Sequence, residues 1–149
     1  MYLISFHQVE SGIRIATAKA FMELSRNVLI VEDDAAMAQM CAKAIRRRGH
    51  SAVVAQSCRD AVAMVRAGSV DVVISDVHMP QMSGIELLAQ LQEIDAQLPV
   101  ILMTGYNNIV SADEAVALGA ADYLSKPFNP ETLIGSIERS FLKRVPQHV

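Results

Sequence analysis

Short apolar runs alternate with longer amphipathic stretches along this chain, and the alternation occurs five times. The first, third and fourth runs are built mainly from Val, Ile and Leu, which is typical of parallel strands that are covered on both faces. The predicted strands are Val28–Val31, Ala52–Ala55, Val70–Ser75, Val100–Met103 and Tyr123–Ser125.

The stretches between these runs have the spacing of amphipathic helices. In the first stretch, positions i, i+3, i+4, i+7, i+8 and i+11 predict one helix face, and Gly49 is expected to end the helix. The residues expected on that inner face are Met37, Met40, Cys41, Ala44, Ile45 and Arg48. The inner positions expected in the later helices are Ala61, Val62, Val65, Ile85, Leu88, Leu91, Leu133, Ile137 and Phe141.

Start and stop signals flank the later helices. Ser57, Ser111 and Asn129 are expected as N-caps, because their side-chain oxygens can accept hydrogen bonds from the unpaired N–H groups of a first turn. Gly68 and Gly119 follow the second and fourth helices. Strands that alternate with helices in this way are joined by right-handed crossovers, so the predicted fold class is α/β, a parallel sheet with helices on both faces.

Two segments lie outside this pattern. Residues 1–26 precede the first predicted strand, and residues 145–149 form a short tail, so the domain itself is expected at residues 27–144. Positions compatible with one amphipathic helix in the first segment are Ile13, Thr17, Ala20, Phe21 and Leu24. That segment is expected either to be an accessory or poorly ordered extension or to pack on the domain or mediate self-association.

Composition narrows the possible partners and the compartment. The 149 residues suit one domain, and 13 Lys and Arg against 16 Asp and Glu give a net charge of −3. An acidic chain without a basic recognition helix is not expected to bind nucleic acid directly. Cys41 and Cys58 are too few for a disulfide framework or a zinc site. No apolar run reaches the length of a membrane span and no basic segment precedes a signal-like stretch, so the expected location is the cytoplasm, with no membrane contact.

Charged and hydroxyl-bearing residues directly follow four of the predicted strands. In an open α/β sheet, ligands bind beyond the carboxyl ends of the strands, so residues from different strands are expected to meet there. The residues in question are Glu32, Asp33, Asp34, Asp76, Thr104 and Lys126. Asp34 is also well placed to cap the following helix. Clustered carboxylates favour a hard divalent cation such as Mg²⁺, and together with a lysine and a hydroxyl they could transfer a phosphoryl group.

Four motifs in this order carry a family resemblance: VLIVEDD, DVHMPQMSG, LMTGY and ADYLSKPF. From about Asn27 to Arg144 the chain resembles the receiver domain of two-component response regulators, the CheY-like family. The spacing of 19 residues between Thr104 and Tyr123 also matches that family. The resemblance implies a flavodoxin-like doubly wound (βα)5 sandwich whose five parallel strands have the order 2-1-3-4-5.

The resemblance also implies roles for residues at the strand ends. Asp76 would accept the phosphoryl group. Asp33 would bind Mg²⁺, or another divalent cation such as Mn²⁺, directly, as would Asp76. Glu32 would bind it through water and His78 through its backbone carbonyl. Asp34 is not carried over as a ligand.

Three further roles follow from the resemblance. Lys126 would bind the phosphoryl group, and the Lys126–Pro127 bond would be cis. Thr104 would be the switch hydroxyl, and Tyr123 the aromatic switch residue that turns inward when Thr104 moves. The face expected to change is the fourth helix, fifth strand and fifth helix, roughly Ile109–Leu118 and Tyr123–Arg144.

The function implied is acceptance of a phosphoryl group from a sensor histidine kinase or phosphotransfer protein. The changed face would then control a downstream effector protein or domain, or form a homodimer. Such a chain is not an enzyme beyond its own phosphorylation and dephosphorylation. An alternative is a receiver excised from a longer transcriptional regulator. A more remote one is an aspartate-nucleophile phosphohydrolase, although that class expects its nucleophile after the first strand.

Some residues are expected to have no part in this chemistry. His7, His50, His78 and His148 are scattered without ligand spacing, so their side chains are expected at the surface. Cys58, close to a helix N-terminus, is expected to be a structural thiol rather than a reactive one.

Overall fold

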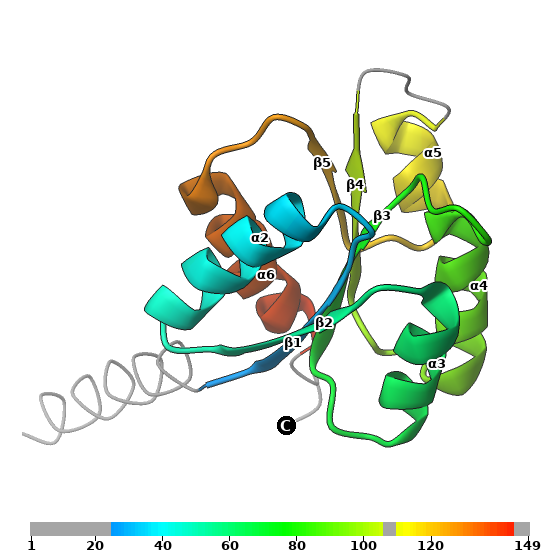
Figure 1. Cartoon of the computed structure of the whole chain (residues 1–149). Helices are drawn as coiled ribbons and strands as arrows, with labels where there is room; N and C mark the ends of the chain where they lie inside the picture. Colours follow the sequence, from blue (N-terminus) through cyan, green and yellow to red (C-terminus); the bar gives the residue numbers. More distant parts are fainter. Residues whose placement is uncertain (1–24, 106–109, 145–149) are drawn as a thin grey trace, which may run out of the picture.

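Five parallel strands form one sheet in the order β2-β1-β3-β4-β5 in the computed structural model, which describes residues 25–105 and 110–144 (Figure 1). This confirms the predicted α/β class and the 2-1-3-4-5 strand order. The strands are β1 (Asn27–Val31), β2 (Ser51–Ala55), β3 (Val72–Asp76), β4 (Val100–Thr104) and β5 (Asp122–Ser125). The helices are α2 (Ala35–Arg47), α3 (Cys58–Arg66), α4 (Gly84–Ile94), α5 (Ala112–Ala117) and α6 (Pro130–Arg144).

Helices cover both faces of the sheet, and each face has its own hydrophobic core. Helices α2 and α6 lie on one face, and α3, α4 and α5 lie on the other (Figure 1). Side chains of β1 alternate between the two cores: Val28 and Ile30 pack toward α2 and α6, while Leu29 and Val31 pack toward α3 and α4. Burial on both faces explains why the sequence of β1 is apolar throughout its buried length.

The buried face of α2 differs from the predicted one. Its buried residues are Ala38, Cys41, Ala42 and Ile45. Met40, predicted inside, is 44% exposed, and Arg48 is exposed beyond the end of the helix. The helical period was right, but the face is rotated, because small alanines let α2 pack closely on the sheet and leave the longer methionine at the edge.

The predicted N-caps are confirmed. Ser57 Oγ accepts a hydrogen bond from the N–H of Asp60 at 3.1 Å, and Ser111 Oγ does the same for Glu114. Asn129 Oδ1 accepts from the N–H of Thr132 at 2.7 Å. These bonds satisfy N–H groups that a helix leaves unpaired in its first turn, and thereby fix where each helix begins.

One predicted surface residue is buried. The His50 side chain is 7% exposed, because it lies under Phe141 of α6 and accepts a hydrogen bond from the chain that enters β1. His78 is exposed as predicted. His7, His148 and the apolar positions predicted between residues 13 and 24 lie outside the described residues. Within the described part of the chain, no helix combines the length and apolarity needed to cross a membrane.

Candidate functional site

The topology brings four strand ends together at one edge of the sheet. Because β1, β3, β4 and β5 are adjacent and parallel, their carboxyl ends lie side by side. Glu32 and Asp33 follow β1 directly, and Asp76 and Thr104 are the last residues of β3 and β4. Lys126 follows β5, and its backbone N–H donates to the carbonyl oxygen of Thr104 at 2.6 Å. Five of the six residues predicted at this edge from the sequence therefore lie there, and the side chain of the sixth, Asp34, caps α2 instead.

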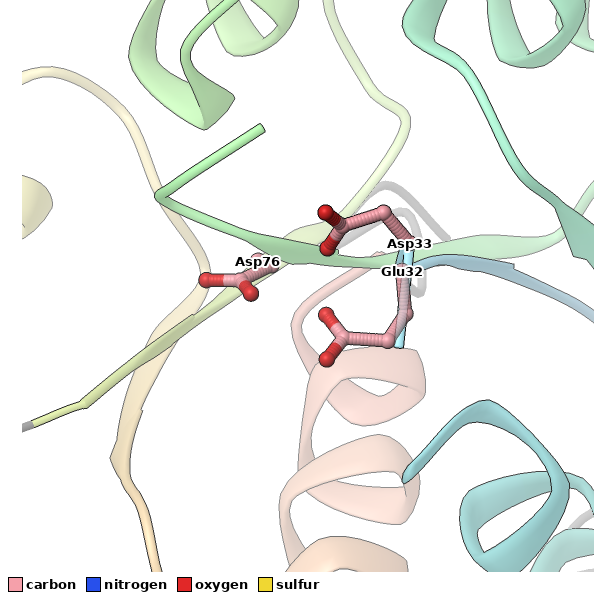
Figure 2. A group of neighbouring side chains, drawn as sticks. All are labelled: Glu32, Asp33 and Asp76. Atoms are coloured by element: carbon pink, nitrogen blue, oxygen red, sulfur yellow. The ribbon is translucent and has the colours of Figure 1, made fainter. Parts of the chain in front are cut away.

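Three carboxylates converge at this edge. Glu32, Asp33 and Asp76 each place one oxygen within 4.8 Å of the others, and the three side chains reach the same space from β1 and β3 (Figure 2). Glu32 and Asp76 are buried, at 2% and 7% exposed, while Asp33 is exposed. Asp33 therefore gives the cluster an edge that solvent can reach.

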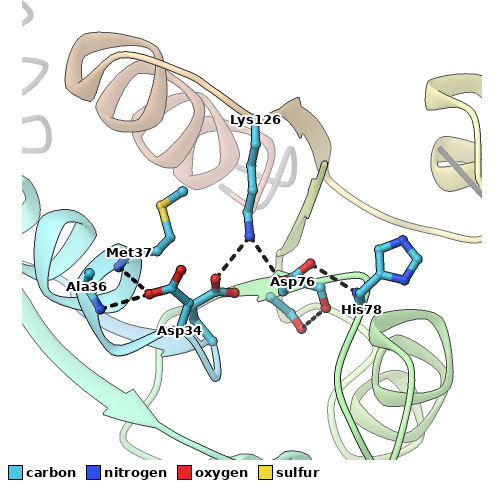
Figure 3. Close-up of polar contacts among 8 residues, drawn as sticks. Asp34, Ala36, Met37, Asp76, His78 and Lys126 are labelled. Carbon is cyan, nitrogen blue, oxygen red and sulfur yellow. Dashed lines mark hydrogen bonds and ion pairs between the residues drawn. The ribbon is translucent and has the colours of Figure 1, made fainter. Parts of the chain in front are cut away.

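Lys126 lies between two of the carboxylates. Its Nζ is 3.0 Å from Glu32 Oε1 and 3.0 Å from Asp76 Oδ2. Figure 3 shows the contact between Lys126 and Asp76. Burial acts to lower the pKa of Lys126, but the two carboxylates raise that pKa above its ordinary value. The lysine therefore stays charged and offsets part of the repulsion among the acidic groups.

The two buried carboxylates titrate differently. Burial, and then the neighbouring Asp76 carboxylate, raises the pKa of Glu32 to about 7, against the opposing effect of Lys126. Burial also acts to raise the pKa of Asp76, but hydrogen bonds from the Glu32 carboxyl, the His78 N–H and Lys126 hold it below its ordinary value. Asp76 is therefore ionised at neutral pH, as a nucleophilic carboxylate must be.

The turn after β3 holds Asp76 in place. The backbone N–H of His78 donates to Asp76 Oδ1 at 3.0 Å (Figure 3), and the N–H of Gly84 donates to the carbonyl of Val77 at 2.8 Å. A Cβ at position 84 would lie 2.9 Å from Val77 Cα and closer still to the carbonyl oxygen of Asp76. Glycine at 84 is therefore what allows α4 to begin directly behind the acidic residue.

Thr104 and Tyr123 lie on the two strands beyond Asp76. Thr104 is fully buried at the end of β4. Tyr123 of β5 is partly buried, and its hydroxyl donates to the carbonyl oxygen of Val110 at 2.5 Å. Nothing in the sequence pointed to Val110, because a backbone carbonyl can be supplied by any residue type.

Two other polar residues have structural roles. Asp34 Oδ1 accepts from the N–H groups of Ala36 and Met37 at 3.0 and 3.2 Å, so its side chain caps α2, as the sequence suggested (Figure 3). Cys58 is buried, its Sγ contacts the carbonyl of Met82 at 3.6 Å, and burial raises the pKa of its thiol. Burial and a raised thiol pKa both favour a structural rather than a reactive cysteine, in line with the prediction.

The acidic cluster has the donors that a hard divalent cation requires. Its ligand atoms are all carboxylate oxygens, and Glu32 Oε2 is buried without a hydrogen-bond partner among the described residues. A buried oxygen of this kind is costly unless a cation or water binds it. The residues present therefore fit an oxygen-coordinated ion such as Mg²⁺.

The chain matches known proteins over most of its length. The family profile "response regulator receiver domain" matches residues 28–138. The chain is 37% identical over 123 residues to the response regulator protein FleR of Pseudomonas aeruginosa, covering 83% of this chain and 26% of FleR. It is 35% identical over 120 residues to the response regulator protein TodT of Pseudomonas putida, covering 80% of this chain and 52% of TodT.

A solved structure agrees with these matches. The beryllofluoride-activated NtrC4 receiver domain dimer superposes with a TM-score of 0.75 at 25% identity, covering 79% of this chain and 98% of that one. The chain spans only about a quarter to a half of the curated relatives named above. The chain therefore belongs to the response regulator receiver domains, the CheY-like family of two-component signal transduction.

Proposed function

We propose that Asp76 accepts a phosphoryl group from a sensor histidine kinase or phosphotransfer protein. The observation that carries this proposal is the position of Lys126 Nζ, 3.0 Å from both Asp76 Oδ2 and Glu32 Oε1, beside three clustered carboxylates. An Asp76 oxygen attacks phosphorus, the new O–P bond forms, and the N–P bond of the donor's phosphohistidine breaks. The leaving imidazole nitrogen keeps the bonding electron pair.

The neighbouring side chains bind and orient the reacting groups. The His78 N–H holds Asp76 Oδ1, which leaves the oxygen beside Lys126 to attack. The Lys126 ammonium then binds a phosphoryl oxygen and offsets its charge. Asp33 and Asp76 would bind Mg²⁺, or Mn²⁺, directly, with Glu32 acting through water and His78 through its carbonyl. The bound cation would neutralise charge on the phosphoryl oxygens.

We propose that phosphorylation causes a conformational change that begins at Thr104 on β4 and reaches the surface. The Thr104 hydroxyl moves to donate to the new phosphoryl group, and Tyr123 turns inward as it leaves the Val110 carbonyl. The face formed by α5, β5 and α6 then changes shape and controls an effector protein or domain, or pairs two copies. The dimeric NtrC4 receiver domain supports the pairing.

The receiver is proposed to span residues 27–144, with residues 1–26 and 145–149 outside it. We propose that it acts in the cytoplasm, does not bind nucleic acid itself, and catalyses only its own phosphorylation and dephosphorylation. The length of FleR and TodT favours one variant of this account, in which the chain corresponds to the receiver of a longer regulator.

Intact mass after incubation with Mg²⁺ and a small acyl-phosphate donor tests the proposal. We expect one added phosphoryl group, which is lost in Asp76→Asn and in the presence of a chelator. Asp34→Asn is the matched control, because asparagine caps a helix as well as aspartate and residue 34 lies outside the acidic cluster. A phosphoryl group that persists in Asp76→Asn would contradict the proposal, as would release of phosphate from simple esters, which a hydrolase would give.

A further inference from the structure

A buried histidine joins three segments at the end of the sheet where β1 begins. The backbone N–H of Arg26 donates to His50 Nδ1 at 3.1 Å. The ring of His50 meets the ring of Phe141 edge to face, with centroids 6.0 Å apart. The Arg26 guanidinium carbon lies 4.8 Å from the centroid of the same Phe141 ring. We call Arg26, His50 and Phe141 the His50 cluster; it joins the chain entering β1, the start of β2 and the last turns of α6.

The hydrogen bond to Arg26 fixes where a proton can bind. Nδ1 uses its lone pair to accept the Arg26 N–H, so the neutral ring carries its hydrogen on Nε2. A second proton can bind only at Nδ1. Two N–H groups would then face each other, so the bond to Arg26 must break when His50 becomes charged.

The surroundings of His50 disfavour the protonated form of its ring but still allow it to form. His50 is 7% exposed, and its Nε2 is buried without a hydrogen-bond partner among the described residues. The charged groups that face it from the described elements are Arg26 before β1, Arg48 after α2 and Glu138 of α6. Burial lowers the pKa of His50, and Arg48 and Arg26 act in the same direction, while Glu138 opposes them.

We propose that the His50 cluster is a pH-sensitive latch. While His50 is neutral, the latch holds Arg26, and with it the start of β1, against Phe141 of α6. When Nδ1 takes a proton, the bond to Arg26 breaks and both Arg26 and Arg48 repel the charged ring, so the chain before β1 and the end of α6 separate. The latch lies at the opposite end of β1 from Glu32 and Asp33, so it acts independently of the phosphoryl chemistry.

Nuclear magnetic resonance of the full chain tests the latch directly. The His50 ring nitrogens report the tautomer and its titration, and hydrogen exchange reports the protection of the Arg26 amide. As the pH is lowered from about 7.5 through the His50 titration, we expect the neutral ring to carry its hydrogen on Nε2 and Arg26 protection to fall about tenfold or more as His50 becomes charged. The amide of Leu29, inside β1, should keep its protection over that range.

A matched variant separates the latch from other effects of acid. His50→Asn keeps an oxygen near the position of Nδ1 but cannot titrate, so Arg26 protection should no longer change with pH. The proposal is overturned by a neutral ring with its hydrogen on Nδ1, or by Arg26 protection that does not follow the His50 titration. Joint loss of Arg26 and Leu29 protection would also overturn it, because it would show unfolding of the whole domain. The wild-type measurement decides alone if the variant does not fold.

Discussion

Lys126 is the residue on which the charge balance of the acidic site depends. It contacts both buried carboxylates at 3.0 Å and is the one cation that the described structure pairs with either of them. A positioned charge of this kind favours the transition state more than the ground state, because negative charge builds on the phosphoryl oxygens during transfer.

Removing this charge should slow phosphorylation. We expect Lys126→Met to lower the rate of phosphorylation by an acyl-phosphate donor about 100-fold, as measured by intact mass against time. Lys43→Met, at an exposed position on α2, is the matched control and should leave the rate unchanged. Equal rates in the Lys126 variant and the wild type would show that the lysine has no part in transfer.

Glu32 should make the metal-free protein less stable as the pH rises. Its pKa is raised from 4.5 to about 7 by burial and by Asp76, so the folded state holds a proton that the unfolded state has lost between those values. The unfolding free energy should therefore fall as the pH rises through that window.

Replacing Glu32 with the neutral glutamine should remove this loss of stability at high pH. In chelator above pH 7, we expect Glu32→Gln to be more stable than the wild type by about 1–2 kcal/mol in urea unfolding, with the difference disappearing near the unfolded-state pKa. Glu131→Gln, on the exposed start of α6, should show no such pH-dependent gain. A wild type that is as stable as Glu32→Gln at every pH would show that the pKa of Glu32 is not raised in the folded protein.

At the scale of elements, the start of α4 depends on one glycine. A side chain at position 84 would press on the backbone of Asp76 and Val77, neither of which can move without disturbing β3. We expect Gly84→Ala to cost about 1–3 kcal/mol of unfolding free energy, as overpacked sites do. Gly105→Ala is the control, because a Cβ there meets nothing within 4 Å. A Gly84 variant as stable as the Gly105 variant would show that residue 84 does not lie close against the backbone of Asp76 and Val77.

The elements could be predicted from the sequence because their signals are local. The apolar runs and capping side chains predict all five strands and the described helices. Because the strands are predicted to be parallel, Glu32, Asp76, Thr104 and Lys126 are predicted to lie at one edge of the sheet. The buried face of α2 was missed because it depends on how closely Ala38 and Ala42 approach the sheet, which hydrophobicity alone does not encode. The burial of His50 was missed because it depends on Phe141, 91 positions away.

At the scale of the whole molecule, Asp76 must be coupled to the face formed by α5, β5 and α6 if phosphorylation is to change that face. Thr104 lies on β4, between the strand of the acceptor and the strand of Tyr123, so it can connect them. A phosphoryl group shifts the population of the molecule only if it binds one conformation better than the other, and the Thr104 hydroxyl is proposed to supply that difference.

Removing the Thr104 hydroxyl should leave phosphorylation of Asp76 intact but abolish the conformational change that follows it. We expect Thr104→Ala to accept a phosphoryl group, while hydrogen exchange in α5 and β5 no longer changes on phosphorylation as it does in the wild type. Thr132→Ala, at the exposed start of α6, should respond like the wild type. The coupling would be refuted by a Thr104 variant whose exchange changes as much as that of the wild type.

Locating the phosphoryl group on the phosphorylated protein tests directly whether Asp76 accepts it. Borohydride reduces an aspartyl phosphate to homoserine, so peptide mass spectrometry of the reduced protein shows which aspartate carried the group. We expect homoserine at position 76 and not at position 33 or 34. Homoserine at either of those positions, or phosphoprotein that yields none, would contradict the assignment to Asp76.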